Sequence, residues 1–295
     1  MLRSMPETQP VMSIVVACVN PRRTLCRWLD AFMPQTRQRA IELLVAQAGD
    51  DETVRSIQRT HGFTLVAGRG DALVPELWGL AMARARGEVI AVTVSTCTPS
   101  TDWLDAIWKA HAESTHAGIG GVIDILPTAT LVDRAIHLVR YTPYIPPLAP
   151  AVVPEIAGDN GTYKREALDD LMPAIERDGF WEVHIHHVLR GRGQSLWLDP
   201  GIRVTVSGPY SILGFSRQRY AHGRMFGRWR SASRTLPSRV LRALVAPLVP
   251  PFMLGRALNV LRTRGRLDMR ALLAVPLAAW FFVCWAAGEA LGLLF

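Results

Sequence analysis

Cysteine is scarce in this chain of 295 residues, which contains four: Cys18, Cys26, Cys97 and Cys284. Because no two of them form a Cys-x-x-Cys pair, the sequence indicates neither a disulfide framework nor a zinc site, and we expect reduced thiols. The first eleven residues have no apolar stretch of signal-peptide length, so nothing in them argues for export. Internal repeats and low-complexity tracts are also missing. These absences predict a globular protein whose body stays in the cytoplasm.

Acidic residues are absent from residues 200–267, although this segment holds thirteen arginines. Residues 1–199 hold 19 basic and 23 acidic residues, so the net charge of +8 comes from the later part of the chain. A basic protein is first suspected of binding nucleic acid. Because this Arg-only stretch leads into an apolar tail, we interpret it instead as a cytoplasmic collar facing anionic lipid, and expect no nucleic-acid partner.

Short apolar runs alternate with helical patterns in the first 125 residues. The chain length suits one α/β domain of roughly 200 to 250 residues plus an accessory segment. Strands of a parallel sheet are buried on both faces and therefore read as apolar runs. We expect strands at residues 12–19, 41–46, 63–67, 89–94 and 118–125, and helices at residues 24–32, 52–60, 74–86 and 102–111. This alternation predicts an α/β fold with a doubly wound, mostly parallel sheet.

The pattern is less regular further along the chain. Residues 143–154 are too rich in proline for a helix or strand, so we expect a loop over the edge of the sheet. Residues 163–171 and 181–190 look helical, and late strands are expected at residues 195–198 and 202–206.

The C-terminal end is apolar. Residues 271–295 carry Glu289 as their only charge and are long enough to cross about 30 Å of hydrocarbon, which predicts a transmembrane segment. The alternative, a buried core helix, would need a second large domain to cover it. Residues 240–261 are interrupted by prolines and carry two arginines, which favours a bent interfacial or re-entrant segment. The expected parts are a polar leader at 1–12, a domain at 13–230, and an Arg-rich collar with a membrane-associated tail at 231–295.

Five short motifs follow one another over some 200 residues. The first two are Ser13-Ile-Val-Val-Ala-Cys-Val-Asn20 and Glu42-Leu-Leu-Val-Ala-Gln-Ala-Gly-Asp50. The others are Gly87-Glu-Val-Ile-Ala91 leading to Asp102-Trp-Leu104, Gly158-Asp-Asn-Gly161 with Lys164-Arg-Glu-Ala-Leu168, and Gly179-Phe-Trp-Glu182. From about Ser13 to Arg230 the chain resembles the inverting glycosyltransferases of family 2, which include cellulose, chitin and dolichol-phosphate-mannose synthases.

This resemblance implies a GT-A fold, in which a nucleotide diphospho-sugar lies across the carboxyl ends of the parallel strands. It implies donor binding by residues at the ends of the first, second and fourth strands: Ala17, Asn20, Gln47, Ser95 and Thr96. It also implies acceptor or diphosphate contacts by Asn160, Arg219 and Arg224. Glu182 matches the place of the catalytic carboxylate, which takes the proton from the acceptor hydroxyl.

The sequence departs from this family at the metal site. Residues 93–97 read Thr-Val-Ser-Thr-Cys where the family has acidic residues, and hydroxyl oxygens do not replace a carboxylate in holding Mg²⁺ or Mn²⁺. We therefore assign no metal ligand. Arg219 and Arg224 are candidates for stabilising the leaving group without a cation, and lipid head groups are their alternative partners. Gln47 stands near the place of a base-binding Asp, and its amide can still hydrogen-bond a pyrimidine.

Two functions remain open, because Glu182 is explained equally well as a first-turn glutamate that stabilises its helix. The first is a membrane-associated hexosyltransferase that moves a sugar from a nucleotide donor, of UDP rather than GDP type, to a lipid or membrane-proximal glycan of the cell envelope. The alternative is a degenerate relative that has lost catalysis and serves as a binding or scaffold partner in a glycan pathway. In either case we expect membrane association with the domain in the cytoplasm.

Overall fold

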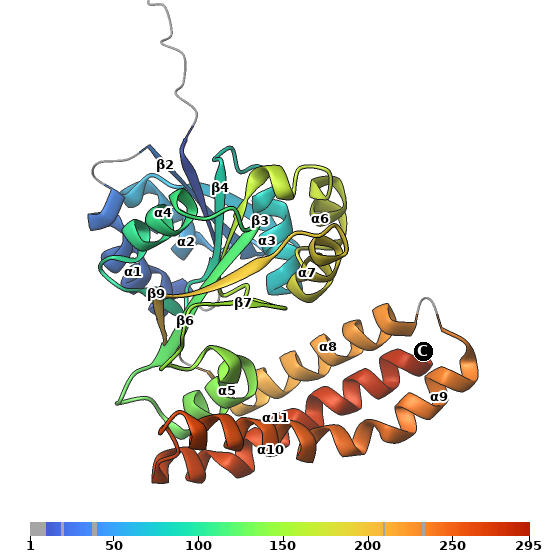
Figure 1. The fold of residues 1–295 in the computed structure, drawn as a ribbon. Helices are drawn as coiled ribbons and strands as arrows, with labels where there is room; N and C mark the ends of the chain where they lie inside the picture. The colour runs from blue at the N-terminus through green and yellow to red at the C-terminus, as the bar shows by residue number, and fades with distance from the viewer. Residues whose placement is uncertain (1–9, 19–20, 37–39, 209, 232–233) are drawn as a thin grey trace, which may run out of the picture. The chain divides into compact units, whose positions relative to one another are not determined.

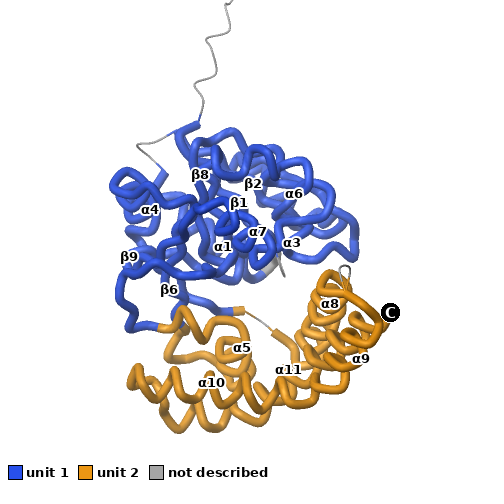
Figure 2. The backbone as a smooth tube through the Cα atoms, turned by 45° about the vertical axis from the view of Figure 1, so that its right-hand side comes forward, with its two compact units in different colours: residues 1–124, 146–207 blue, residues 125–145, 208–295 orange. Residues whose placement is uncertain are grey.

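The computed structural model describes residues 10–18, 21–36, 40–208, 210–231 and 234–295. The chain forms two compact units, coloured separately in Figure 2. The sheet unit consists of Met1–Asp124 and Pro146–Ser207, and the helical unit consists of Ile125–Ile145 and Gly208–Phe295. The helical unit therefore takes an internal segment of the chain in addition to the C-terminal part.

The first four strands of the sheet unit are parallel. They are β1 (Met12–Cys18), β2 (Ile41–Ala48), β3 (Thr64–Gly68) and β4 (Val89–Val94), with β1 between β2 and β4 and β2 beside β3. Every residue of β1 is buried, as its apolar run predicts for a central strand covered on both faces. The connecting helices are α1 (Pro21–Phe32), α2 (Glu52–His61) and α3 (Val74–Met82). The predicted α/β fold is thus confirmed, with strands close to their expected bounds.

The rest of the sheet is antiparallel, so the sheet is mixed rather than mostly parallel. Its strands are β5 (Cys97–Pro99), β6 (Gly118–Ile125), β7 (Ala151–Val153), β8 (Asn160–Lys164) and β9 (Leu196–Val206). The strand order is β3-β2-β1-β4-β8-β6-β9-β5, with β7 added on β9. Figure 1 shows α1, α2 and α4 (Trp103–Ala112) on one face, and α3, α6 (Met172–Asp178) and α7 (Glu182–Gly191) on the other.

The helix expected at residues 163–171 is wrong. Tyr163 belongs to β8, which pairs with β4 on one side and β6 on the other, and only a short 3₁₀ turn at Arg165–Ala167 follows. The Tyr163 ring is completely buried and its hydroxyl lies 2.8 Å from His186 Nε2. Packing from both sides therefore overrides the local pattern. The expected loop at 143–154 also contains β7, and the two late strands are one continuous β9.

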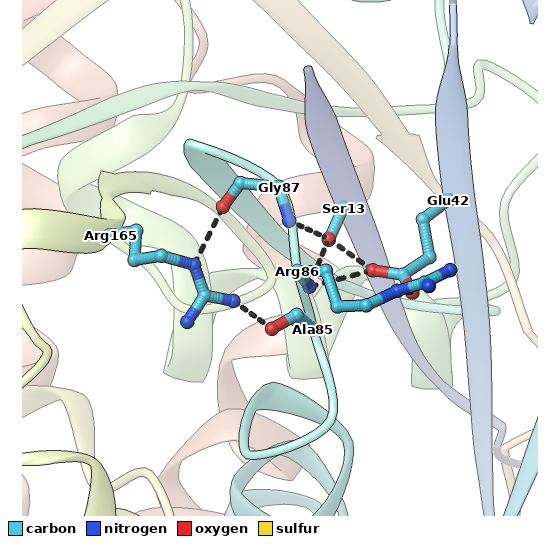
Figure 3. Close-up of polar contacts among 6 residues, drawn as sticks. All are labelled: Ser13, Glu42, Ala85, Arg86, Gly87 and Arg165. Atoms are coloured by element: carbon cyan, nitrogen blue, oxygen red, sulfur yellow. Dashed lines mark hydrogen bonds and ion pairs between the residues drawn. The ribbon is translucent and has the colours of Figure 1, made fainter. Parts of the chain in front are cut away.

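A polar network holds the amino-terminal edge of the parallel strands (Figure 3). Ser13 Oγ donates to Glu42 Oε2 at 2.5 Å. Gly87 N, in the turn before β4, donates to Ser13 Oγ at 2.8 Å. Arg86 donates to Glu42 at 2.9 Å, while Arg165 donates to the carbonyl oxygens of Gly87 and Ala85. Burial acts to raise the pKa of the Glu42 carboxyl, but the bonds from Ser13 and Arg86 outweigh it, so that pKa lies below its usual range. These polar groups bond to one another and stabilise the amino-terminal edge of the sheet. In open α/β sheets ligands bind at the opposite edge, at the carboxyl ends of the strands.

The helical unit consists of α5 (Leu131–Tyr141), α8 (Ile212–Ser231), α9 (Leu236–Val245), α10 (Val249–Thr263) and α11 (Met269–Leu294), with short 3₁₀ turns at Thr142–Tyr144 and Ala246–Leu248. Its core joins α5, α8, α10 and α11 through apolar side chains that include Ile136, Phe215, Leu261 and Phe281. Two stretches are long and apolar enough to cross a membrane, Leu236–Thr263 and Met269–Leu294.

Helices α8 and α11 meet along a seam of glycines. A Cβ at Gly223 would lie 2.1 Å from Trp285 O, and one at Gly227 would lie 2.3 Å from Glu289 O. On the facing helix, a Cβ at Gly288 would lie 2.1 Å from Tyr220 O. Gly292 similarly approaches the backbone of α8. Each helix thus contributes a Gly-x-x-x-Gly motif, which lets the two backbones approach as transmembrane and other tightly packed helices do.

Candidate functional site

The carboxyl ends of β1, β2 and β4 form one edge of the sheet unit. Pairing sets Cys18 beside Gln47 and Ala17 beside Val94, so the ends of the three strands are neighbours. Ala17 is completely buried, and its carbonyl oxygen accepts from Ser95 N at 3.0 Å. Four of the five predicted donor-binding residues therefore gather at this edge. The fifth, Asn20, lies outside the described residues.

The turn Ser95–Thr96 after β4 is closed by neighbouring polar groups. Both side chains are buried, and Ser95 Oγ lies 2.8 Å from Thr24 Oγ1 of α1. Burial raises the pKa of the Cys18 thiol to about 12, outweighing its hydrogen bond with Ser95. That thiol therefore stays protonated at neutral pH. Thr24 was not singled out by the sequence, because 71 positions separate it from Ser95 and only the fold brings them together.

Among the described residues, Gln47 has a buried side-chain amide that makes no hydrogen bond. The residue is 2% exposed, and neither Nε2 nor Oε1 makes a hydrogen bond within the described part of the chain. Buried polar groups in proteins are nearly always paired, and an unpaired one costs about 1 to 3 kcal/mol. An amide offers both a donor and an acceptor, which is the pattern that a nucleobase edge presents.

Glu182 begins α7 and is half-buried. A Cβ placed on Gly158 would lie 3.6 Å from Glu182 Cδ and 2.7 Å from the ring of Trp78, so the carboxyl group and this ring flank the same glycine. Trp78 in turn donates from Nε1 to Thr93 O at 2.7 Å, and Thr93 Oγ1 donates to Asp159 O at 2.8 Å. These contacts connect Glu182 to the carboxyl end of β4.

Asn160 lies in the interior of the sheet. Its Oδ1 accepts from Trp103 Nε1 at 2.9 Å, and its Nδ2 donates to the carbonyl oxygens of Val122 and Ile202 at 3.0 and 3.1 Å. Because the residue is completely buried and both ends of its amide are engaged, this arrangement braces β6, β8 and β9.

The two predicted phosphate-binding arginines belong to the helical unit. Arg219 donates to His222 Nδ1 at 3.2 Å, and its guanidinium lies 5.1 Å from the centre of the Phe215 ring. Arg224 is exposed on α8. Their role in the site remains a prediction.

Comparisons with solved structures identify the fold. The chain is similar to the mannosyltransferase PcManGT from Pyrobaculum calidifontis, solved with GDP-Man and Mn²⁺, at 18% identity and a TM-score of 0.53, over 97% of this chain and 87% of that one. It is also similar to GalNAc-T7, solved with UDP, GalNAc and Mn²⁺, at 14% identity and a TM-score of 0.52, over 75% of this chain and 51% of that one. No family model matches the sequence, and no curated protein gives a significant sequence match. The chain therefore has a GT-A glycosyltransferase fold.

The residues present do not fit a divalent cation of the kind found with those two enzymes. The turn after β4 offers the hydroxyls of Ser95 and Thr96 but no carboxylate. Within the ranges that the structure describes, no group of three or more His, Cys, Asp or Glu side chains is arranged to hold a metal ion. Mg²⁺ and Mn²⁺ prefer charged oxygen ligands, which this turn does not supply. We therefore derive no catalytic step through a metal.

Proposed function

We propose that this protein is a membrane-associated glycosyltransferase that moves a hexose from a nucleotide sugar, of UDP type, to a lipid or a membrane-proximal glycan. The observation that carries the proposal is the carboxyl group of Glu182, which flanks Gly158 together with the ring of Trp78, whose Nε1 donates to Thr93 O of β4 in a GT-A fold. In such a fold the nucleotide lies at the carboxyl edge of the parallel strands.

Glu182 acts as the general base in this proposal. Its carboxylate takes the proton of an acceptor hydroxyl as that oxygen attacks the anomeric carbon, and the nucleoside diphosphate leaves with the electrons of the broken bond. A single displacement of this kind inverts the anomeric centre. Charge on the leaving diphosphate is balanced by guanidinium groups, with Arg219 and Arg224 as the candidates, because arginine binds phosphate oxygens without a cation.

Gln47 reads the nucleobase in this proposal. Its unpaired amide offers one donor and one acceptor, and the hydrogen-bonding edge of uracil offers their complements. Binding would therefore satisfy a group that makes no hydrogen bond within the described residues, which supports a base-binding role for Gln47.

The alternative function is that of a degenerate relative which binds a nucleotide or a partner without catalysis. It is favoured by one observation, the absence of a carboxylate in the buried turn Ser95–Thr96. The two functions differ in their dependence on the general base, because only an enzyme needs Glu182 to accept a proton.

Calorimetry on the full-length protein in neutral detergent tests the proposal first. UDP, GDP and their sugar conjugates are titrated with Mn²⁺, with Mg²⁺ and with EDTA. Micromolar binding of UDP that survives EDTA supports the proposal, and no binding of any nucleotide refutes it. Sugar transfer is then compared between Glu182→Gln and the control Glu176→Gln, an exposed glutamate of α6. Nucleotide binding with no sugar transfer by the wild type or either variant would leave only the alternative function, whereas equal transfer by both variants would remove Glu182 as the base.

The helical unit provides the membrane attachment in this proposal. Exposed apolar side chains of α9, α10 and the 3₁₀ turn between them include Leu241, Leu244, Leu248 and Phe252, each more than 60% exposed. Residues 200–267 combine this surface with thirteen arginines and no acidic residue, which suits an anionic bilayer on the cytoplasmic side.

The glycine seam favours a helical unit that lies in the plane of the bilayer surface over one that crosses it. Helices α8 and α11 run in the same direction, since Trp280 donates to Ser216 near one end and Arg230 pairs with Glu289 toward the other. A span made by α11 would take α8 with it into the hydrocarbon. The arginines of α8 include the exposed Arg217, and each would cost about 2.5 to 3.5 kcal/mol at the bilayer centre. At the surface Arg217 reaches the lipid phosphates in this proposal.

Thiol labelling distinguishes the two arrangements. Single cysteines at Arg266→Cys and Phe295→Cys mark the two ends of α11, in a background where Cys26 and Cys284 are serine. The full-length protein is added to preformed vesicles and treated with an impermeant maleimide. In-plane attachment predicts labelling of both positions, whereas protection of one of them would show that α11 crosses the bilayer.

A further inference from the structure

A cavity of about 560 Å³ lies within the helical unit, apart from every residue assigned to sugar transfer. Three arginines line it from different elements: Arg134 of α5, Arg266 of the turn before α11, and Arg270 in the first turn of α11. Asp268 is the one acidic side chain among the lining residues, and its Oδ1 is engaged by Ala271 N at 2.7 Å. The lining is therefore strongly basic.

Two of these guanidinium groups converge on a single oxygen atom. Arg134 and Arg270 each donate to Pro127 O at 2.8 Å, so their donor nitrogens lie less than twice that distance apart. Two like charges so close repel each other unless an anion lies near both. Arg134 Nε is also buried and makes no hydrogen bond within the described ranges, so this guanidinium group is not fully satisfied by the protein. This arrangement matches the geometry in which arginines bind phosphate oxygens in pairs.

Apart from His137, the remainder of the lining is apolar. Leu138, Ile145, Leu261 and Ala271 belong both to the cavity wall and to the hydrophobic core of the helical unit. At the surface Met269 is 69% exposed and Leu126 is 39% exposed, so apolar groups also reach solvent beside the arginines. A free inorganic anion would leave this apolar wall without a partner. A ligand with a phosphate group on an apolar chain satisfies both parts.

We propose that this cavity binds the head group of a phosphate-bearing lipid, with Arg134, Arg266 and Arg270 on the phosphate and the apolar wall on the first carbons of the chain. The site is independent of sugar transfer, since none of its residues belongs to the sheet edge. It gives the helical unit recognition of one lipid class in addition to general attraction to an anionic surface.

Calorimetry on the full-length protein in neutral detergent tests this site with three soluble probes: dihexanoyl phosphatidic acid, dihexanoyl phosphatidylcholine and inorganic phosphate. The structure predicts that phosphatidic acid binds at least about ten-fold more tightly than the other two, because only it combines an unshielded phosphate with an apolar chain. Equal binding of inorganic phosphate and phosphatidic acid would overturn the lipid assignment, and no binding of either would overturn the site.

Matched variants separate the cavity from the general positive charge of the protein. Arg134→Gln with Arg270→Gln is expected to weaken phosphatidic acid about ten-fold or more, while Arg256→Gln with Arg262→Gln removes two exposed charges of α10 and leaves affinity unchanged. Equal weakening in both pairs would overturn the proposal. Arg266→Gln repeats the test from the turn before α11, should the first pair fold poorly. UDP binding is measured in the same samples, so failure of the lipid site and failure of the proposed function are distinguishable.

Discussion

Replacement of Gln47 by Met removes the unpaired amide at the carboxyl edge of β2 while keeping a similar volume. In the nucleotide-free protein both polar atoms of this side chain are buried without a partner in the described structure. Leaving a buried donor or acceptor unsatisfied costs about 1 to 3 kcal/mol, and an apolar group of the same shape does not carry that cost. We therefore expect Gln47→Met to stabilise the free protein by about 1 to 3 kcal/mol.

The same change is expected to weaken nucleotide binding. Loss of two hydrogen bonds to the base, at about 0.5 to 1.5 kcal/mol each, corresponds to a rise in Kd of roughly ten-fold or more, since about 1.4 kcal/mol is a factor of ten. The variant should thus gain stability and lose affinity together. That combination is unusual for a core substitution, most of which destabilise by about 0.5 to 3 kcal/mol.

Urea unfolding without nucleotide, followed by calorimetry with UDP, measures both effects. Gln58→Met is the matched control, because Gln58 Nε2 donates to Phe63 O at 3.1 Å and its replacement loses a real hydrogen bond. We expect the control to be destabilised by about 0.5 to 1.5 kcal/mol with unchanged affinity. If Gln47→Met destabilises as much as the control does, the amide is satisfied in solution and the argument for base reading by Gln47 fails.

Three further outcomes follow from the structure. Glu182→Gln should lower the transfer rate about 10² to 10⁴-fold with UDP affinity unchanged, as measured by product formation and calorimetry; a rate near that of the wild type would remove Glu182 as the base. Gly288→Val should loosen the glycine seam, because its Cβ would lie 2.1 Å from Tyr220 O, whereas a Cβ in the control Gly255→Ala meets nothing within 4 Å. The melting temperature in detergent should fall in Gly288→Val and not in Gly255→Ala. Equal melting temperatures would show that α8 and α11 are not tightly packed there. Burial, with help from Arg190, lowers the pKa of His186 to about 3, so the stability that depends on its neutral imidazole is complete above pH 6.5 and is lost as the pH falls toward 3. This residue should make the wild type about 2 kcal/mol less stable at pH 5 than at pH 7. The same loss of stability in His186→Gln would contradict the lowered pKa of His186.

The sequence by itself determined the parallel half of the sheet and its connecting helices. A strand buried on both faces, such as β1, must be apolar along its whole length, and that signal is local. The missing carboxylates of the turn at Ser95–Thr96 are equally a property of the sequence. The apolar character of residues 271–295 was evident as well, although composition did not decide whether they cross a bilayer.

Only the tertiary structure decided the features that depend on contacts between distant residues. Tyr163 and Lys164 belong to a strand because β4 and β6 pair with β8, although the local pattern from residue 163 favours a helix. The unpaired amide of Gln47, the placement of Glu182 beside Gly158, and the glycine seam of the helical unit also depend on packing across long stretches of chain. A sequence records which residues are available, whereas burial and hydrogen-bond partners are set by neighbours that only folding brings together.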